Sequence, residues 1–407
     1  MQLVAYGAQD IYYTGNGNQN GYKPKFRIYY CKHIIGDIVV KFEIYDIEFL
    51  GFEWVKFTSN SQCVNIFDFG YKAINCEKCL LNKLPKFKSI DEFKKMKYLN
   101  CSNNKLGNIN KLMYSNELIW LNSSYNILKT IPKKIYSLEY FDFSNNQVKE
   151  NIDFLMYPNL KYLMASSNQI KSVSNLPNDL EYLDLSNNPI TELEVLPYGL
   201  KYLLIVQTKI KSINLIELEN LEYLDISIND LNTQCLDGLP SSLTYLNCSQ
   251  CGISGLNNLP TNLTKLICIN NEIKTLDMLP ESLEYLDCDH NKITKLDNLP
   301  NVLNKLICSN NLITSLDNLP ANLTELNCEI NNIQQLKNLP PKLKKSNIKY
   351  TKLKNDDNNC LVPQIAFYKQ SYKNNTDFEF TKQSKSEKKQ TKYFNKANKY
   401  MFKNMRK

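Results

Sequence analysis

Apolar residues along most of the chain recur in a fixed short pattern rather than in long runs. Between Leu239 and Pro340 the dipeptide Leu-Pro returns at constant intervals, and the unit beginning at Leu279 reads LPESLEYLDCDHNKITKLDN. Aligned units give the consensus L-P-x-x-L-x-x-L-x-C-x-x-N-x-I-x-x-L. Leu286 and Cys288 stand two positions apart, a spacing that places both side chains on the same face of a strand. The pattern therefore predicts one short strand in each unit, with this pair turned inward.

The first leucine of the unit can be followed far beyond the Leu-Pro region. Steps of about 20 to 22 positions, within the range of known short repeats, follow a longer first step. They connect Tyr71, Met96, Leu118, Leu138, Leu160, Leu180, Leu200, Leu221, Leu243, Leu263, Leu283, Leu303, Leu323 and Leu343. About fourteen turns then cover residues 71–353. A turn this short leaves no room for a helix on its return side, where Leu-Pro favours an extended path. We expect the strands to stack in parallel, about 4.8 Å apart.

The core of the unit, L-x-x-L-x-L/C-x-x-N-x-L, resembles the leucine-rich-repeat family. This resemblance implies an α/β-type solenoid, a horseshoe with parallel strands on the concave face and a mostly extended or irregular convex side. The short Leu-Pro units look like those of bacterial secreted effectors and of some protist or giant-virus repeat proteins. One effector family carries a ubiquitin-ligase module after its repeats, and the segment 354–407 is too short for that module.

An asparagine follows the strand in most turns, and an amide can both donate and accept hydrogen bonds. We expect it to satisfy buried backbone groups of its own turn and of the adjacent one. The asparagines are Asn104, Asn126, Asn146, Asn168, Asn188, Asn229, Asn271, Asn291, Asn311 and Asn331. The residues that replace it, each with at least a weak donor, are Cys79, Thr208, Cys251 and Thr351.

Thirteen cysteines are present, and most follow the repeat. Seven share one register: Cys76, Cys101, Cys248, Cys268, Cys288, Cys308 and Cys328. A metal or redox ladder is one interpretation, and a stack of small buried side chains is the favoured one. The pairs Cys76/Cys79 and Cys248/Cys251 resemble half zinc sites, but they belong to distant turns and cannot share one tetrahedral ion. We expect no metal and no cofactor, and free thiols in a reducing, intracellular compartment.

Residues that alternate with the inward pair are expected to face solvent on the concave side, in aromatic, acidic or amide, and hydroxyl rows. The aromatic row is Tyr98, Trp120, Tyr140, Tyr162, Tyr182, Tyr202, Tyr223, Tyr245 and Tyr285, and the acids of the second row are Asp142, Asp184, Asp225 and Asp287. Stacked rings can simply stabilise adjacent strands, or they can form a protein-binding surface, since Tyr and Trp are enriched at interface hot spots. The acids disfavour nucleic acid on this face. Lys265, Ile267, Lys305 and Ile307 change its character in the later turns.

The two ends do not fit the repeat. Residues 1–70 contain alternating apolar stretches that predict a β-rich cap or docking segment. Residues 354–407 are polar and rich in lysine, and Thr381 to Lys407 hold ten Lys/Arg against Glu387, a balance of +9. With a net charge of +8, the rest of the chain carries 8 − 9 = −1. Phe394, Ala397, Met401 and Met405 recur at near-helical spacing, so the tail is either a basic amphipathic helix for an anionic surface, membrane or nucleic acid, or a solvated segment.

Candidate chemistry is sparse. The only histidines are His33 and His290, and no nucleophile, zinc-peptidase or phosphate-loop pattern occurs. The start of the chain has no basic region followed by an apolar run, so we expect no signal peptide, and no apolar stretch approaches the ~18 residues of a membrane helix. We expect a non-catalytic module that binds a host or viral protein, without a small-molecule substrate.

The first residues carry a second resemblance. Gln2 to Asn16, QLVAYGAQDIYYTGN, is similar to the opening segment of the major capsid proteins of large nucleocytoplasmic DNA viruses. The likeness implies a giant-virus origin and a location in the host cytoplasm or the virion. The double jelly-roll sequence is not recognisable beyond this segment, so a docking segment or a recombination remnant is implied rather than a capsid-forming protein.

Overall fold

The computed structural model describes the repeat region almost continuously and the first part of the chain only in segments. The described residues are 3–11, 26–35, 38–44, 73–75, 80–84, 94–149, 151–193, 195–231, 236–334, 336 and 338–348. Side chains of 3–11, 26–35, 38–44, 73–75 and 98 lie outside this description, as do Cys76, Cys79, Thr351 and the lysine-rich tail.

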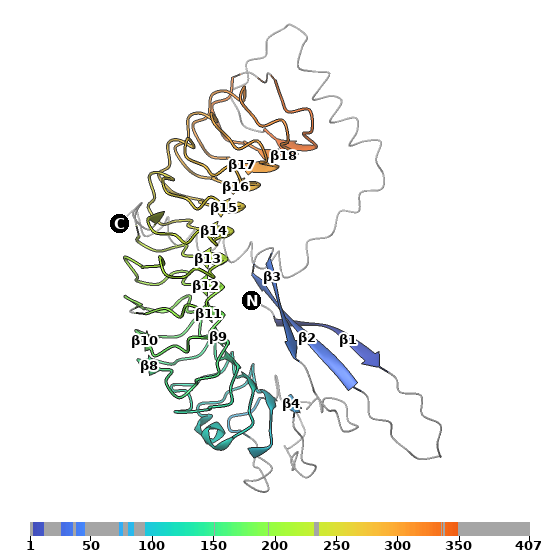
Figure 1. Ribbon diagram of the computed structural model, residues 1–407, viewed down its shortest axis with the longest axis vertical. Helices are drawn as coiled ribbons and strands as arrows, with labels where there is room; N and C mark the ends of the chain where they lie inside the picture. The colour runs from blue at the N-terminus through green and yellow to red at the C-terminus, as the bar shows by residue number, and fades with distance from the viewer. Residues whose placement is uncertain are drawn as a thin grey trace. The chain divides into compact units, whose positions relative to one another are not determined.

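The repeat region is a parallel 14-stranded sheet in which each strand is three residues long (Figure 1). Its strands are β4 (Ala73–Asn75), β5 (Tyr98–Asn100), β6 (Trp120–Asn122), β7 (Tyr140–Asp142), β9 (Tyr162–Met164), β11 (Tyr182–Asp184), β12 (Tyr202–Leu204), β13 (Tyr223–Asp225), β14 (Tyr245–Asn247), β15 (Lys265–Ile267), β16 (Tyr285–Asp287), β17 (Lys305–Ile307), β18 (Glu325–Asn327) and β19 (Lys345–Asn347). Consecutive turns pair without a register shift, as Tyr182, Leu183 and Asp184 do with Tyr202, Leu203 and Leu204. The predicted parallel-strand solenoid is confirmed.

The core is a column of side chains contributed once per turn. Leu183, Leu185 and Ile190 are inaccessible to solvent, and so are their counterparts in nearly every described turn. Each turn buries these side chains only against the turns on either side, so the array is stabilised as a one-dimensional stack.

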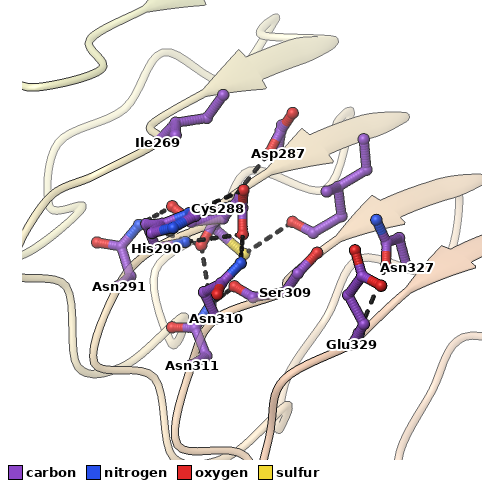
Figure 2. A network of polar contacts seen from close by, with 12 residues as sticks. Ile269, Asp287, Cys288, His290, Asn291, Ser309, Asn310, Asn311, Asn327 and Glu329 are labelled. Carbon is purple, nitrogen blue, oxygen red and sulfur yellow. Dashed lines mark hydrogen bonds and ion pairs between the residues drawn. The ribbon is translucent and has the colours of Figure 1, made fainter. Parts of the chain in front are cut away.

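The asparagine ladder makes the bonds expected of it. Asn311 Nδ2 donates to the carbonyl oxygens of Cys308 (3.1 Å) and Ser309 (2.9 Å) in its own turn and of Cys288 (3.0 Å) in the turn before. Its Oδ1 accepts from the backbone N–H of Ile293 at 3.0 Å. Figure 2 shows this arrangement with Asn291 in the same place one turn earlier.

The two described substitutes keep part of this role. Thr208 Oγ1 donates to Asn229 Oδ1 at 2.7 Å, and Cys251 Sγ lies 3.2 Å from the Ile226 carbonyl oxygen. The CxxC spacing of Cys248 and Cys251 therefore reflects the strand and ladder positions of one turn.

The residue before the ladder position adopts a left-handed backbone in every turn from 101 to 331, with φ between 51° and 57°. The residues are Asn103, Tyr125, Asn145, Ser167, Asn187, Gln207, Ile228, Gln250, Asn270, His290, Asn310 and Ile330. Asparagine tolerates this region, whereas a β-branched side chain is strained there. The fold therefore imposes a left-handed backbone on Ile228 and Ile330, although their β-branched side chains are poorly suited to it.

Replacing Ile228 with Asn is expected to raise the free energy of unfolding by about 1 kcal/mol, because the left-handed conformation costs L-residues roughly 1–2 kcal/mol. The side chain is already 37% exposed, so little packing is lost. Chemical denaturation checks the change, and Asn187→Ile at the equivalent position should lower the midpoint. A lower midpoint for Ile228→Asn would contradict the assignment of strain.

The return side is mostly irregular, as predicted, with two additions. The 3-10 helix η2 spans Asn110–Tyr114, and the short strands β8 (Ile152–Asp153) and β10 (Val173–Ser174) pair in parallel. The first part of the chain forms an antiparallel sheet of β1 (Leu3–Ile11), β2 (Phe26–Ile35) and β3 (Ile38–Ile44) in the order β1-β2-β3. The strands expected from the alternating stretches of residues 1–70 are present there.

Candidate functional site

The concave face of the solenoid carries the rows expected from the sequence. Strand pairing places Tyr140, Tyr162, Tyr182, Tyr202, Tyr223 and Tyr245 side by side on successive strands. Tyr98 and Trp120 pair before them, whereas Tyr285 is separated from Tyr245 by Lys265. The aromatic row is thus continuous up to β14 and alternates with lysine afterwards.

The expectation that these rows face solvent is wrong for most of their members. Trp120, Tyr140, Tyr182, Tyr223 and Tyr245 are buried, as are Asp142, Asp184 and Asp287. Strands about 4.8 Å apart place a side chain on each side of every ring. The rings of Trp120 and Tyr140 stack at 4.9 Å and those of Tyr223 and Tyr245 at 4.0 Å. Stacking therefore accounts for much of this row, and Tyr162, Tyr202 and Tyr285 are its half-exposed members.

From Tyr140 to Tyr223 the tyrosines fall into two alternating sets, one buried and one half-exposed. Acids of the second row, Asp184 and Asp142, are electrostatic neighbours of the Tyr182 hydroxyl, whereas the neighbours of Tyr162 are Glu181 and Glu139. Burial is the largest cause that raises the pKa of both phenols, to about 12 for Tyr162. Tyr182 and Tyr202 are tilted by 34° with ring centroids 6.1 Å apart. Because neighbouring rings are turned in different directions, the wide tyrosine side chains fit between strands that lie close together.

The acids of the second row accept hydrogen bonds from the backbone of their own turns. Oδ1 of Asp184 accepts the backbone N–H of Ser186 at 3.0 Å, and Asp142 does the same for Ser144 at 2.9 Å. Asp225 accepts from both the N–H and the hydroxyl of Ser227. Such bonds from an Asp or Asn side chain to the backbone two residues on stabilise turns. Hence the same position accepts Asn122, Asn247 and Asn327 elsewhere in the sheet.

Apolar residues separate the acids along this row. Met164 lies between Asp142 and Asp184, and Leu204 lies between Asp184 and Asp225. Like charges directly opposite one another on adjacent strands are destabilising, and the alternation avoids them. Burial raises the pKa of Asp142 to about 6.

A fourth row, made of charged residues that the sequence reasoning missed, lies one position before the tyrosines. Lys161 pairs with Glu139 at 3.2 Å and Lys201 with Glu181 at 3.1 Å. The signal was available, because Glu139, Lys161, Glu181, Lys201 and Glu222 occupy one register and alternate in sign. These half-exposed ion pairs border the half-exposed rings of Tyr162 and Tyr202.

In the later turns lysine ammonium groups cover the aromatic ring. Nζ of Lys265 lies 4.6 Å and Nζ of Lys305 5.2 Å from the Tyr285 ring centroid, so the ring is held between two cations. Lys305 and Lys345 both pair with Glu325. On the next row, Asp287 lies between Ile267 and Ile307.

The cysteine register is a buried column, in keeping with the packing interpretation. Cys101, Cys248, Cys268, Cys288, Cys308 and Cys328 are all buried and form no disulfide bond. Burial raises the pKa of the Cys328 thiol to about 12 and the pKa of Cys268, Cys288 and Cys308 well above the ordinary value. Such thiols stay protonated and are poor metal ligands. Among the described residues no group of three or more His, Cys, Asp or Glu side chains is arranged to hold a metal ion.

His290 occupies a left-handed turn position (Figure 2), where its Nδ1 lies 2.9 Å from Asp289 Oδ2. Asn310 Nδ2 donates to the other oxygen of that carboxylate at 3.0 Å. The hydrogen bonds of Asp289, His290 and Asn310 connect two adjacent turns of the solenoid. In the described part of the chain, no helix has the length and apolar character needed to cross a membrane.

Comparisons with known proteins agree with this architecture. Residues 136–178 and 158–198 match the family model of leucine-rich repeats in two copies. YopM from Yersinia enterocolitica WA-314 is similar at 27% identity and a TM-score of 0.54, over 70% of this chain and 69% of that chain. YopM from Yersinia pestis, described as a leucine-rich effector protein, is similar at 25% identity and a TM-score of 0.53, over 70% and 90% of the two chains.

A third solved structure shares a further feature. The functional domain of InlJ from Listeria monocytogenes, described as including a cysteine ladder, is 25% identical with a TM-score of 0.51, over 65% of this chain and 69% of that chain. No curated protein matches the sequence. The family model thus identifies leucine-rich repeats within residues 136–198, and the parallel-strand solenoid contains almost no helix over the residues that the structure describes.

Proposed function

We propose that this leucine-rich-repeat solenoid is a non-catalytic module that binds another protein through its concave face. The fold is typical of protein-interaction modules, and the similar YopM of Yersinia pestis is described as an effector. The observation that carries the proposal is the zone of half-exposed Tyr162 and Tyr202 bordered by the pairs Lys161–Glu139 and Lys201–Glu181. Tyrosine is enriched at interface hot spots, and the rim that surrounds the core of an interface is polar.

The buried members of the row are unsuitable for testing this proposal, because removing Tyr182 opens a cavity in the stack. Tyr162 and Tyr202 can be changed more safely to Lys, which the fold accepts at the same register in Lys265 and Lys305. We expect the double variant Tyr162→Lys/Tyr202→Lys to keep its free energy of unfolding within roughly 1 kcal/mol of the parent's, in the range of surface changes.

Affinity capture from the cells in which the protein acts, read by quantitative mass spectrometry, measures the effect. Partners enriched by the parent chain should fall at least tenfold, which corresponds to about 1.4 kcal/mol. Tyr114→Lys is the matched control, because Tyr114 is exposed and lies in η2, away from the concave strands. Equal capture by the parent chain and the folded double variant would exclude this zone as the binding surface.

A second candidate rests on the likeness of Gln2 to Asn16 to the start of giant-virus major capsid proteins. Under this second proposal, the protein originates from such a virus and is a virion component docked through residues 1–70, rather than a protein of the host cytoplasm. Mass spectrometry of purified particles distinguishes the two, since a packaged protein is recovered at a constant ratio to capsid protein. Binding of nucleic acid or of an anionic surface is proposed only for residues 381–407.

A further inference from the structure

The return side of the solenoid carries exposed apolar side chains that folding does not require. Leu155 is 59% exposed, Val195 76% and Ile216 64%, each five positions before the first leucine of its turn. Other turns have asparagine at the same position, namely Asn175, Asn258, Asn298 and Asn338. An apolar side chain is therefore dispensable for folding at this position, and three of them gather in four successive turns.

Two tyrosines extend this apolar surface sideways. Tyr136 and Tyr198 both stand two positions before the first leucine of a turn, and each is more than half exposed. The Tyr136 hydroxyl reaches Met156 Sδ in the next turn at 3.4 Å. We name as the return-side stripe the six residues Tyr136, Leu155, Met156, Val195, Tyr198 and Ile216. The neighbouring strands β8 and β10 lie on the side of the solenoid away from β9 and β11 (Figure 1). Contiguous exposed apolar surface of this kind marks interaction sites.

The charges beside the return-side stripe are separated by sign. The stripe lies in the last five positions of five successive turns, which are the segments 133–137, 155–159, 175–179, 195–199 and 216–220. The first segment holds Lys133 and Lys134. The fifth holds Glu217 and Glu219, and the three segments between hold only Asp179. Charged residues earlier in the described parts of these turns do not follow this order, since they are Lys129, Lys149, Asp153, Lys171, Glu192, Lys209 and Lys211. The stripe thus has a basic end and an acidic end.

Each end is in contact with a tyrosine of the stripe. Nζ of Lys134 lies 5.6 Å from the ring centroid of Tyr136, and the Tyr198 hydroxyl donates to Oε2 of Glu217 at 3.3 Å. Lys134 and Glu217 both stand four positions before the first leucine that follows them. The same exposed position of the fold therefore carries opposite charges at the two ends. Four turn spacings of about 4.8 Å, roughly 19 Å, separate them.

A second copy of the same chain is the partner that this arrangement fits. In a twofold dimer both copies use the same surface, which must be complementary to itself. A twofold axis along the middle segment 175–179 places the first segment of one copy on the fifth segment of the other. Lys134 then meets Glu217 and Leu155 meets Val195, because each pair shares a position in its turn, and both contacts occur twice. An axis along the stack of turns would instead place lysine on lysine, which is unfavourable.

We propose that the return-side stripe is the interface of a homodimer whose two solenoids lie antiparallel about segment 175–179. Leu155 and Val195 form its apolar centre, and the Lys134–Glu217 pairs lie at its two ends. The contact covers only five turns, so it is a modest interface and the dimer is in equilibrium with the monomer. This inference goes beyond the proposed binding function, because the concave strands of both copies remain free to bind a partner.

Sedimentation velocity of the full chain under reducing conditions, at concentrations up to about 100 μM, measures the association expected of a modest interface. The variant Leu155→Asn/Val195→Asn removes the apolar centre and should raise the dimer dissociation constant at least about tenfold. Its unfolding midpoint should be kept, since asparagine occupies this position in other turns. Met278→Asn is the matched control, because Met278 is 63% exposed at the same position of a turn outside the stripe. It should leave the dissociation constant unchanged.

Charge reversal tests the antiparallel arrangement. Lys133→Glu/Lys134→Glu makes both ends of the stripe acidic, and Glu217→Lys/Glu219→Lys makes both ends basic. Each variant alone should therefore dimerise at least about tenfold more weakly than the parent, because like charges meet at both ends of the interface. An equimolar mixture of the two variants should form heterodimers, since an acidic end then always meets a basic end. High salt concentration should weaken the parent dimer and remove most of the difference between the parent and the variants.

Three outcomes overturn the proposal. The first is a parent chain that stays monomeric over the whole concentration range. The second is a dimer that persists unchanged in the folded Leu155→Asn/Val195→Asn variant, which would place the interface elsewhere in the chain. The third is a mixture of the two charge-reversed variants that associates no better than either variant alone, which would exclude the antiparallel arrangement.

Discussion

Asn188→Ala is expected to lower the free energy of unfolding by about 3–5 kcal/mol, because several buried backbone groups depend on this amide. Nδ2 of Asn188 donates to the carbonyl oxygens of Ala165 (2.9 Å), Leu185 (3.0 Å) and Ser186 (3.3 Å). Its Oδ1 accepts the N–H of Ile170 at 3.0 Å. Alanine leaves these groups without their partner, and each such loss costs roughly 1–3 kcal/mol, with incomplete additivity.

Urea denaturation followed by far-UV circular dichroism measures this loss. Asn188→Thr should lie between the parent chain and Asn188→Ala, because Thr208 shows that a hydroxyl retains part of the ladder. Asn159→Ala is the control, since this exposed amide donates to the Tyr136 carbonyl oxygen at the surface, and its removal should cost less than about 1 kcal/mol. A loss for Asn188→Ala no larger than the control's would mean that the ladder is not a major source of stability.

The ladder was predictable from sequence because one chemical requirement recurs at every turn. A chain that leaves a buried strand must satisfy its backbone groups, and a short amide can donate two hydrogen bonds and accept others at once. The same regularity determined the strand register, since Leu183 and its equivalents recur at a constant offset from the ladder. Thr208 and Cys251 follow the rule as well, because each retains a donor.

The state of the concave rows was harder to predict. Alternation correctly assigned Tyr182 and Asp184 to the face opposite Leu183, but it says nothing of how far the neighbours cover them. Burial depends on ring tilt and on the residue one strand away, such as Met164 beside Asp184. Those contacts connect residues a whole turn apart in the sequence and leave no local signal. The return-side pair β8–β10 was missed for the same reason, as two residues are too few to show alternation.

The concave surface also differs along its length, which affects how a partner can bind. Up to β14 the aromatic row is unbroken, and from β7 to β13 it is bordered by alternating Glu and Lys. From β15 onwards Lys265 and Lys305 enclose Tyr285, and Ile267 and Ile307 are half-exposed beside Asp287. A protein partner that spans both zones would therefore meet aromatic contacts at one end and lysine with aliphatic contacts at the other, which fixes its orientation.

Asp287→Asn is expected to stabilise the protein at neutral pH by as much as about 3 kcal/mol, since each pKa unit corresponds to about 1.4 kcal/mol. Burial is the main cause that raises the pKa of this carboxyl from 3.8 to about 6, against the opposing effects of Lys265 and Lys305. The amide keeps the turn bond, because Asn247 and Asn327 make it in their own turns.

The pH dependence follows from the direction of this shift. Below about pH 4 the Asp287 carboxyl is protonated in both the folded and the unfolded chain, so the parent and the Asp287→Asn variant both carry a neutral side chain at this position. Between about pH 4 and 6 the unfolded chain releases the proton while the folded chain holds it, so the free energy of unfolding of the parent falls as pH rises. Above about pH 6 the whole penalty is present. The stability difference between Asp287→Asn and the parent should therefore grow across this window and then level off.

Denaturation midpoints of the parent and the Asp287→Asn variant between pH 3.5 and 8 measure the stability difference. The titration of all other groups is common to both proteins and cancels in this difference. Asp277→Asn is the matched control, because Asp277 is exposed and its carboxylate accepts only a 3.4 Å bond from Asn298 among the described contacts. A difference that is constant with pH would show that Lys265 and Lys305 offset the effect of burial on the Asp287 carboxylate, and a difference that falls as pH rises would show that they stabilise this carboxylate in the folded protein. In that case the lysines, rather than Ile267 and Ile307, dominate the environment of this position.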